Sequence, residues 1–525
     1  MQLRSWAARG LVTGAAGLLQ ALSVASPQDG NPRWWLQILS LAVLCRMVQR
    51  PTPWPQAVAL GWIFGLVWLS ASFWWLFISM HVHGGLSAPV AGTAVVLLAA
   101  VLALYYGVAV GVFACLTRDR YASDAFLFFG VWLGAEVLRG SLFTGFPWAG
   151  SGYAHVEGPL AAFASWVGVY GISALSALLA FLVAQLTRPP RTSRSCWMMA
   201  SAGASVLGVG YLLGSCSDGR NPSGQSSPLR VALLQGNISQ DEKFDARTGI
   251  PLALEWYAQQ VRYSSADLVV TPETAIPILA KNLPPTYIDT LQAALASSDR
   301  AALVGLPMAT EGGGYTNSVV GIGAAAPGYR YDKHHLVPFG EFVPAMFGWF
   351  TRMMNMPLGD FSRGGTAQPS FLWKDQRLAP NICYEDLFGE ELAVRFREAA
   401  LAPTILVNLS NIAWFGNTVA IDQHLNISRM RAMEFRRPVL RATNTGATAA
   451  IDSYGRVTAM LPPYTRGVLE VEVRGESGVT VFAWWSSRFA LWPYWGLVLA
   501  ALWSPLRFAT RSGKGRDQAR RCWDF

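Results

Sequence analysis

The chain has 525 residues, 52% of them apolar and only 14% charged, with 22 tryptophans and a net charge of +9. A soluble protein carries about a quarter charged residues, so much of this surface must face something other than water. The basic residues occur in short loops beside apolar runs and not on one folded face, which argues against a nucleic-acid partner. The composition therefore predicts a membrane protein, and the length predicts two or more folded units.

Apolar stretches long enough to cross a bilayer, about 20 residues each, recur through the first part of the chain. The first has a short charged start like that of a cleavable signal peptide, but further apolar stretches follow directly, so we interpret it as a retained helix. We predict a membrane domain over 1–214 with seven transmembrane helices, and an eighth at 482–506. The seven are expected at 7–24, 34–49, 55–79, 87–116, 122–139, 160–186 and 196–214.

The basic residues predict how the chain is oriented in the membrane. They gather before the first predicted helix and after the second, fourth, sixth and eighth, whereas the alternate loops hold little beyond Arg33 and Arg139. Loops rich in Lys and Arg stay on the cytoplasmic side. We therefore expect both termini to be cytoplasmic, including a basic tail at 507–525, and the long segment between helices seven and eight to lie outside.

Neither the cysteines nor the histidines form a metal-binding pattern. The six cysteines include no CxxC pair and no His/Cys spacing typical of zinc, so neither a zinc site nor a disulfide framework is indicated. His81 and His83 form a pair in a loop, but no third ligand is nearby in the sequence. We expect no metal, and we expect Cys383 to be a free thiol.

The composition changes at 215–228, a linker rich in Gly, Ser, Asn and Pro. Over 229–475, short apolar strands then alternate with helical segments. This alternation predicts an α/β domain whose helices cover the faces of a sheet. Strands are expected at 229–237, 267–271, 302–306, 318–322, 378–383, 404–408 and 439–442, and helices around 252–261, 286–298, 389–400 and 420–436.

Three of the predicted strands lead to residues with catalytic chemistry. Glu273 follows one strand, Lys333 precedes a stretch rich in Pro and Gly, and Cys383 ends another strand. A carboxylate can accept the proton of a thiol, and an ammonium group can stabilise a thiolate and an oxyanion. Each residue alone also has a structural explanation: helix capping, a solvated charge or core packing. Spacing along the chain does not show whether the three side chains meet.

The segment after Glu341 is dense in large apolar residues. They are Phe342, Val343, Met346, Phe347, Trp349 and Phe350. Such residues usually form a core, but Met and aromatic side chains also suit a surface that adapts to lipid tails. Because the neighbouring helices would hold this domain at the bilayer, we favour an arm through which acyl chains enter.

Several motifs resemble those of the nitrilase (carbon–nitrogen hydrolase) superfamily, and most closely its membrane-bound branch, the apolipoprotein N-acyltransferase family. They are Gln235–Ile238, Pro272–Thr274, Lys333–Pro344, Cys383–Glu385, Ala413–Gly416 and Arg441–Gly446, with His81–Gly85 and Phe146–Trp148 in the membrane part. The resemblance extends from near residue 60 to the last predicted helix. It implies an extramembrane α-β-β-α sandwich that carries a Glu–Lys–Cys triad, beside a polytopic α-helical membrane domain of eight spans.

The resemblance also implies roles for individual residues. Cys383 would be the nucleophile that becomes an acyl thioester, Glu273 the general base, and Lys333 the cation that supports the tetrahedral intermediate. Further positions that match the family's site are Asn317, Glu341, Tyr384, Glu385 and Trp414. Two positions depart from the family pattern: Ile412 replaces an Asp, and Phe244 replaces a Trp that often follows the lysine of the first loop.

By the same resemblance, the expected reaction is the last step of bacterial lipoprotein maturation. An acyl chain would pass from a phospholipid to Cys383 and then to the α-amine of an apolipoprotein's diacylglyceryl-cysteine, without a metal or nucleotide cofactor. The protein would lie in the bacterial inner membrane with its catalytic domain on the periplasmic side. Since flanking helices would cover the surface through which superfamily domains associate, we expect a monomer.

Two other interpretations keep the fold but change the activity. The chain could be a membrane-tethered amidase, in which case the products would be a free acid and an amine and not an N-acylated lipoprotein. It could also be a non-catalytic membrane scaffold, in which case Cys383 would be inert toward acylating probes. The presence of Glu273, Lys333 and Cys383 together argues against the scaffold.

Overall fold

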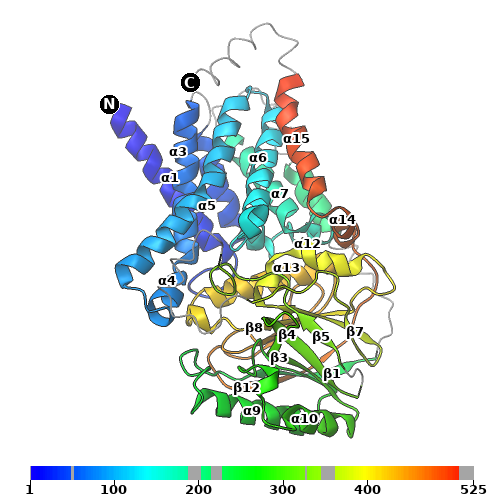
Figure 1. Ribbon diagram of the computed structural model, residues 1–525. Coiled ribbons are helices and arrows are strands. Elements are labelled where there is room, and N and C mark those ends of the chain that lie inside the picture. The colour runs from blue at the N-terminus through cyan, green and yellow to red at the C-terminus, as the bar shows by residue number, and fades with distance from the viewer. Residues whose placement is uncertain are drawn as a thin grey trace. The chain divides into compact units, whose positions relative to one another are not determined.

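The computed structural model describes residues 2–48, 52–186, 201, 203–213, 227–324, 328–343 and 361–507. The chain divides into two compact units (Figure 1). The membrane unit comprises residues 1–74, 92–219 and 489–525, and the catalytic unit comprises residues 75–91 and 220–488. The predicted linker 215–228 and tail 507–525 lie almost wholly outside the described residues.

The membrane unit is a bundle of apolar helices. Within the described ranges, five helices are long and apolar enough to cross a membrane: α1, α3, α5, α6 and α7. This confirms a polytopic α-helical unit, while the expected total of eight spans stays a prediction. The helices of this unit are α1 (Gln2–Val24), α2 (Trp34–Met47), α3 (Trp54–Phe73), α5 (Ala88–Leu116), α6 (Tyr121–Ser141), α7 (Ala164–Leu186) and α15 (Trp492–Arg507), with a shorter helix at Gly203–Leu213.

A buried ion pair fastens one loop of the membrane unit. Arg139 lies inside α6, and not in a loop as predicted, where it pairs with Glu136 at 3.2 Å. The Arg139 guanidinium donates to the carbonyl oxygens of Phe146 and Trp148, while the Glu136 carboxylate accepts from the amide and the hydroxyl of Ser151. A charge in such an apolar bundle must be paired, and here the pairing also holds the loop that follows α6.

Two predicted transmembrane segments have different limits in the structure. The segment 55–79 is not one helix, because α3 ends at Phe73 and is followed by α4 (Leu76–Ile78) and a π-helical turn, η1 (Ser79–His83). The segment 482–506 is divided between α14 (Val481–Phe489) and α15, with Ala490 in the left-handed region between them (φ +46°). The segment 482–506 is therefore not one continuous helix, and its assignment as the eighth span stays a prediction.

In its described residues, the catalytic unit contains two sheets of six strands each. The order of strands is β12-β1-β2-β3-β4-β5 in the first sheet and β11-β10-β9-β8-β7-β6 in the second. Strands β1, β2 and β3 run parallel, as do β7, β8 and β9. The strands are β1 (Leu229–Gln235), β2 (Leu268–Val270), β3 (Ala301–Ala309), β4 (Tyr315–Gly323), β5 (Arg330–Asp332), β6 (Phe371–Trp373), β7 (Gln376–Ile382), β8 (Ile405–Ser410), β9 (Val439–Thr443), β10 (Ala449–Ile451), β11 (Val457–Met460) and β12 (Gly467–Val473).

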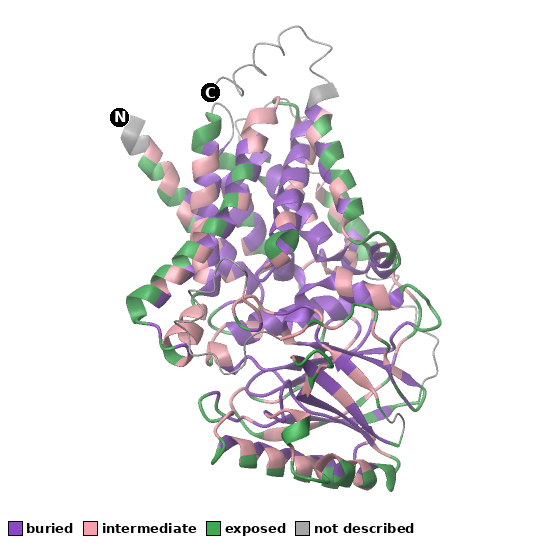
Figure 2. Cartoon of the chain, in the orientation of Figure 1, coloured by how far each residue is buried: buried purple, intermediate pink, exposed green. Residues whose placement is uncertain are grey.

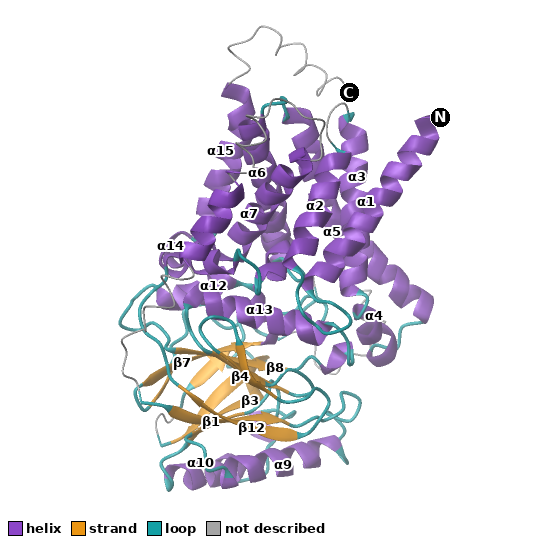
Figure 3. Cartoon of the chain, turned by 180° about the vertical axis from the view of Figure 1, so that it is seen from behind, coloured by secondary structure: helices purple, strands orange, loops and turns teal. Residues whose placement is uncertain are grey.

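The two sheets pack face to face between layers of helices, as the view from behind shows (Figure 3). Because successive residues of a strand point to opposite faces, Val231 and Leu233 lie in the core between the sheets, whereas Ala232 and Leu234 pack under the helices. This confirms the α-β-β-α sandwich. The first sheet is covered by α9 (Gly249–Tyr263) and α10 (Tyr287–Ala296), and the second by α12 (Gly389–Ala393), α13 (Ala420–Phe435) and α14.

The two helix layers differ in how deeply they are buried. Helices α9 and α10 each carry an exposed face, whereas α13 is buried along almost its whole length (Figure 2). Helix α13 nevertheless has a polar sequence, so its polar side chains must find partners inside the protein.

Candidate active site

The three residues predicted to carry the chemistry lie where strands end. Glu273 follows β2, Lys333 follows β5 directly, and Cys383 follows β7. The Nζ atom of Lys333 lies 3.1 Å from Oε1 of Glu273, and the Cys383 thiol interacts electrostatically with both charged groups. The structure thus brings the three side chains together, although β2 and β5 belong to one sheet and β7 to the other.

One ammonium group shared by two carboxylates forms the centre of this site. Lys333 is 1% exposed, and its Nζ atom also lies 2.9 Å from Oε1 of Glu341. The Asn317 side chain donates to both carboxylates, at 2.7 Å to Glu273 and 2.9 Å to Glu341, and the backbone N–H of Asn411 donates to the other Glu273 oxygen at 2.8 Å. Burial alone would lower the pKa of Lys333, but the two carboxylates outweigh it and raise the pKa above its ordinary value. Lys333 is therefore a permanent cation in this site.

Cys383 occupies a strained position at the end of β7. Its φ of +52° lies in the left-handed region, a conformation that costs about 1–3 kcal/mol for a residue with a side chain. The residue stays partly exposed and its thiol is free, as predicted. Loss of water around the sulfur and the nearby Glu273 carboxylate raise the pKa of Cys383 to about 12, with Lys333 opposing. The thiol is therefore protonated at neutral pH and needs a base.

Glu385 acts on the backbone around the site. Its carboxylate accepts from the backbone N–H of Ile382 and of His334, at 2.6 Å each, and from the Tyr331 hydroxyl at 2.8 Å. Burial raises the pKa of Glu385, although these donors oppose the shift. Glu385 thereby ties the end of β7 to the loop that carries Lys333.

The two remaining predicted site residues, Tyr384 and Trp414, make ring contacts. Tyr384 is buried, and its ring packs beside those of His335 and Phe388. The ring of Trp414 lies 5.7 Å from that of His83, between centroids. Both aromatic residues therefore pack against other rings of the catalytic unit.

Little of the predicted lipid-entry arm lies within the described residues. Phe342 packs under the guanidinium of Arg363, 5.0 Å from the ring centroid, and Val343 follows it. The other four predicted members of the arm, Met346, Phe347, Trp349 and Phe350, lie outside the described residues.

Two residues in the site were not predicted from the sequence. Lys243 is 2% exposed, and its Nζ atom donates to the backbone oxygen of Glu273 at 3.2 Å. Burial lowers the pKa of Lys243 to about 8, with Glu273 and Cys383 opposing. His424 lies 3.3 Å from the backbone oxygen of Cys383. Both come from segments remote in sequence, although a lysine in an otherwise polar loop beside the Gln235–Ile238 motif was a usable signal.

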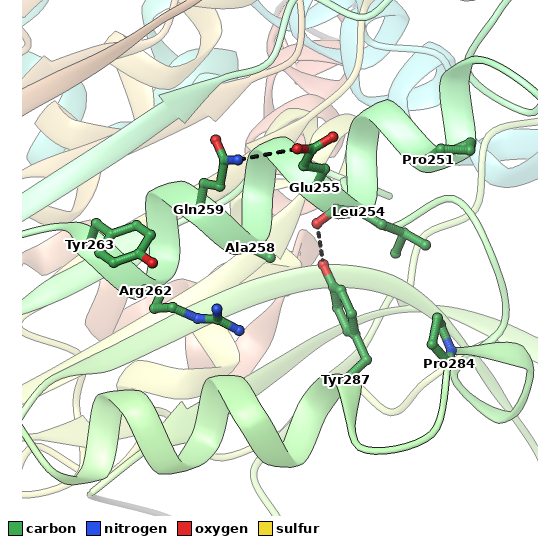
Figure 4. Close-up of a pocket in the computed structure, with 9 residues that line it drawn as sticks. All are labelled: Pro251, Leu254, Glu255, Ala258, Gln259, Arg262, Tyr263, Pro284 and Tyr287. Atoms are coloured by element: carbon green, nitrogen blue, oxygen red, sulfur yellow. Dashed lines mark hydrogen bonds between the residues drawn. The ribbon is translucent and has the colours of Figure 1, made fainter.

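A separate groove lies on the outer surface of the catalytic unit, between α9 and α10 (Figure 4). Its volume is about 430 Å³, and Tyr287 crosses it to donate to the backbone oxygen of Leu254 at 2.7 Å. Its lining includes none of the three triad residues. The cluster at the strand ends is thus the stronger candidate for the active site.

The fold of the catalytic unit and the cluster of Glu273, Lys333 and Cys383 together define the class of protein. An α-β-β-α sandwich with Glu, Lys and Cys at its strand ends is the arrangement of carbon–nitrogen hydrolases, and the carbon-nitrogen hydrolase family model matches residues 230–479. The model of the apolipoprotein N-acyltransferase N-terminal domain matches residues 16–182. An apolipoprotein N-acyltransferase of Verminephrobacter eiseniae is 52% identical, over 91% of this chain and 92% of that protein, and one of Ralstonia nicotianae is 46% identical, over 93% and 91%.

The chain therefore belongs to the apolipoprotein N-acyltransferase family. The five membrane-spanning candidates are in keeping with this assignment, and the chain is a membrane protein.

Proposed function

We propose that this protein transfers an acyl chain from a phospholipid, through a thioester on Cys383, to the α-amino group of the diacylglyceryl-cysteine at the N-terminus of apolipoproteins. Membership of the apolipoprotein N-acyltransferase family supports the reaction. The observation that carries the mechanism is the contact of Lys333 with Glu273 beside the Cys383 thiol. Glu273, Lys333 and Cys383 are proposed as the catalytic residues.

The first half-reaction forms the thioester. Because the pKa of Cys383 is raised to about 12, its proton passes to Glu273 as the sulfur attacks the ester carbonyl of the phospholipid. The Lys333 ammonium, which stays charged, stabilises the oxyanion of the tetrahedral intermediate. The intermediate then collapses. The bond between the acyl carbon and the glycerol oxygen breaks, the glycerol alkoxide takes the proton from Glu273, and the lysophospholipid leaves.

The second half-reaction forms the amide. The neutral α-amine of the diacylglyceryl-cysteine attacks the thioester carbonyl and gives a proton to Glu273. The C–S bond breaks, and the Cys383 thiolate takes that proton back. Water must be kept from the thioester in the meantime, because hydrolysis would release a free fatty acid. The apolar residues that follow Glu341 fit this requirement as a lipid-entry arm.

The supporting residues hold the reacting groups. Asn317 donates to both carboxylates and so keeps Glu273 beside Lys333. Glu341 shares the ammonium, and its second oxygen accepts from the Val337 N–H at 2.9 Å. We propose that three further residues shape the surroundings of the reacting groups: Glu385, Tyr384 and Trp414.

The proposed location is the bacterial inner membrane, with the catalytic unit on the periplasmic side and both termini in the cytoplasm. The distribution of Arg and Lys supports this orientation. A phospholipid of the outer leaflet would be the acyl donor, and the protein is proposed to act as a monomer.

Mass spectrometry tests the proposal. The purified protein is incubated with a phospholipid of defined acyl chains, and the Cys383 peptide is analysed before and after addition of a diacylglyceryl-cysteine peptide. We expect an added acyl mass on Cys383 that the peptide discharges, and no adduct in Cys383→Ala. Cys45→Ala, at a fully buried cysteine of the membrane unit, is the matched control and should be acylated on Cys383 like wild type. Transfer by Cys383→Ala, or release of free acid from the adduct without amide formation, would overturn the proposal.

A further inference from the structure

A buried polar network lies behind the nucleophile, and the mechanism above does not use it. Helix α13 contributes His424 and Ser428, which are one helical turn apart and 0% exposed. They meet Arg441 of β9, also 0% exposed, and Asp386 of the turn that Cys383 begins. Two consecutive elements, α13 and β9, thus meet the turn that carries the nucleophile.

The contacts of His424 determine which ring nitrogen carries its proton. The Nη2 atom of Arg441 lies 3.2 Å from Nδ1 of His424. A guanidinium group can only donate hydrogen bonds, so Nδ1 must accept and the ring proton must be on Nε2. Nε2 lies 3.3 Å from the backbone oxygen of Cys383. The neutral imidazole therefore donates to that oxygen, and burial together with the Arg441 charge holds the pKa of His424 well below its ordinary value.

Arg441 is itself held in place from two sides. Its Nη1 atom donates to the Ser428 hydroxyl at 2.5 Å and lies 3.7 Å from the Asp386 carboxylate. The Ser428 hydroxyl in turn donates to Asp386. Because Asp386 is three residues from Cys383 in the same turn, this closed network fixes both the turn and the histidine that faces it.

The backbone of Cys383 needs such support. Its positive φ is strained, and strained residues at reactive sites persist only where the surroundings hold them. Its backbone oxygen receives a second donor, the Asn408 side chain of β8, at 3.4 Å. Together the two donors fix the peptide that follows Cys383, and with it the direction of the side chain.

We propose that His424 is a positioning residue for the nucleophile: as a neutral imidazole it donates from Nε2 to the backbone oxygen of Cys383 and so aims the thiol at Glu273 and Lys333. This inference rests on the proposed role of Cys383. The alternative is that His424 only satisfies Arg441 and stabilises the fold.

Two substitutions separate these roles, because each keeps one half of the imidazole. In His424→Gln the side-chain NH₂ can reach the position of Nε2 and donate to the Cys383 oxygen. In His424→Asn the side-chain oxygen can take the position of Nδ1 and accept from Arg441, but the donor to Cys383 is lost. Both are measured for acylation of Cys383 by a defined phospholipid in a single turnover, for the phospholipid concentration at half-maximal rate, and for Tm.

We expect His424→Asn to acylate roughly 10- to 100-fold more slowly, with the half-maximal concentration unchanged and Tm close to wild type. The range is taken by analogy from the loss of hydrogen-bond partners that orient metal ligands. His424→Gln should stay within a few-fold of wild type in rate even if its Tm falls. Equal rates in the two variants, or rates that follow Tm, would show a structural role only and overturn the inference.

Asn408→Ala provides a second test that leaves α13 intact. It removes the other donor to the same oxygen, so the acylation rate should again fall at an unchanged half-maximal concentration. If the histidine variants do not fold, a wild-type rate in Asn408→Ala overturns the inference. The failure of the proposed function would be recognised separately, because wild type itself would then form no acyl adduct.

Discussion

Two buried ion clusters, one in each unit, differ in how their charges are balanced. In the membrane unit, Arg139 faces one carboxylate, that of Glu136, and its Nη1 atom donates to the backbone oxygens of Phe146 and Trp148. In the catalytic unit, Lys333 faces the two carboxylates of Glu273 and Glu341, which retain some exposed surface. The first pair is neutral, whereas the three groups Glu273, Lys333 and Glu341 together carry one negative charge in excess beside a partly exposed thiol.

This difference shows which buried charges serve structure and which serve chemistry. In a balanced pair each charge is neutralised by the other, so its removal should cost stability. An unbalanced cluster keeps a carboxylate that can accept a proton, and its excess charge helps to raise the pKa of Cys383. Removal of one of its members should therefore change reactivity.

The largest effect is expected for Glu273→Gln. An amide cannot accept the thiol proton, so acylation of Cys383 should slow by about 10³-fold or more, near the upper part of the range for loss of a general base. Single-turnover mass spectrometry of the Cys383 peptide measures the rate. Glu255→Gln, on the outer helix α9, is the matched control and should be acylated on Cys383 at the wild-type rate. A rate within tenfold of wild type in Glu273→Gln would mean that another group takes the proton.

The next effect is expected in the membrane unit. Glu136→Gln leaves the Arg139 charge buried without its counter-charge, and breaking such a pair costs about 3–5 kcal/mol of folding free energy. Thermal unfolding in detergent should show a clearly lower Tm. Asp29→Asn, which breaks the exposed pair with Arg33, should leave Tm close to that of wild type, because exposed ion pairs add little to stability. Equal Tm values for the two variants would refute a stabilising role for the buried pair.

Part of the fold and part of the catalytic site could be predicted from the sequence alone. Glu273, Lys333 and Cys383 were predicted at strand ends because apolar runs and family motifs mark those positions directly. The alternation of strands and helices predicted an α/β domain, and the family resemblance implied the sandwich. Strands β5, β6 and β10–β12 were missed because they are short or lie outside the apolar core pattern. The helix 420–436 was predicted from spacing, and the structure forms α13 there.

What the sequence analysis missed depends on contacts between distant segments. Lys243 and His424 enter the site because the fold brings a loop and a buried helix to Glu273 and Cys383. Polar residues in a helix usually indicate a solvent-facing side, so nothing in the sequence marks α13 as buried. The sequence also gives no sign of the break at Ala490, because a continuous apolar run does not show where the backbone leaves the helical region.

A smaller effect, in the direction of higher reactivity, is expected for Glu341→Gln. Glu341 adds to the negative charge that raises the pKa of Cys383, so its neutralisation should lower that pKa and shift the pH dependence of thiol alkylation to lower pH. Alkylation by iodoacetamide at pH 8 should be roughly 3- to 10-fold faster, since each tenfold corresponds to one pKa unit. Glu311→Gln, in an exposed turn, should match wild type. Slower alkylation in Glu341→Gln would reverse the assigned sign.

The smallest and most specific effect is expected at Lys243, whose environment contrasts with that of Lys333. Both lysines are buried. Lys333 pairs with two carboxylates, whereas Lys243 donates to a backbone oxygen. Burial therefore lowers the pKa of Lys243 to about 8. The charged form is thus penalised in the folded state. The penalty is complete below about pH 8 and disappears as pH rises to the ordinary value of 10.5, because the lysine is then neutral in both states. Lys243→Met should therefore raise Tm at pH 7, and the gain should shrink steadily between pH 8 and 10. A gain that is constant over this range would show that packing of the Met side chain, and not the buried charge, is responsible.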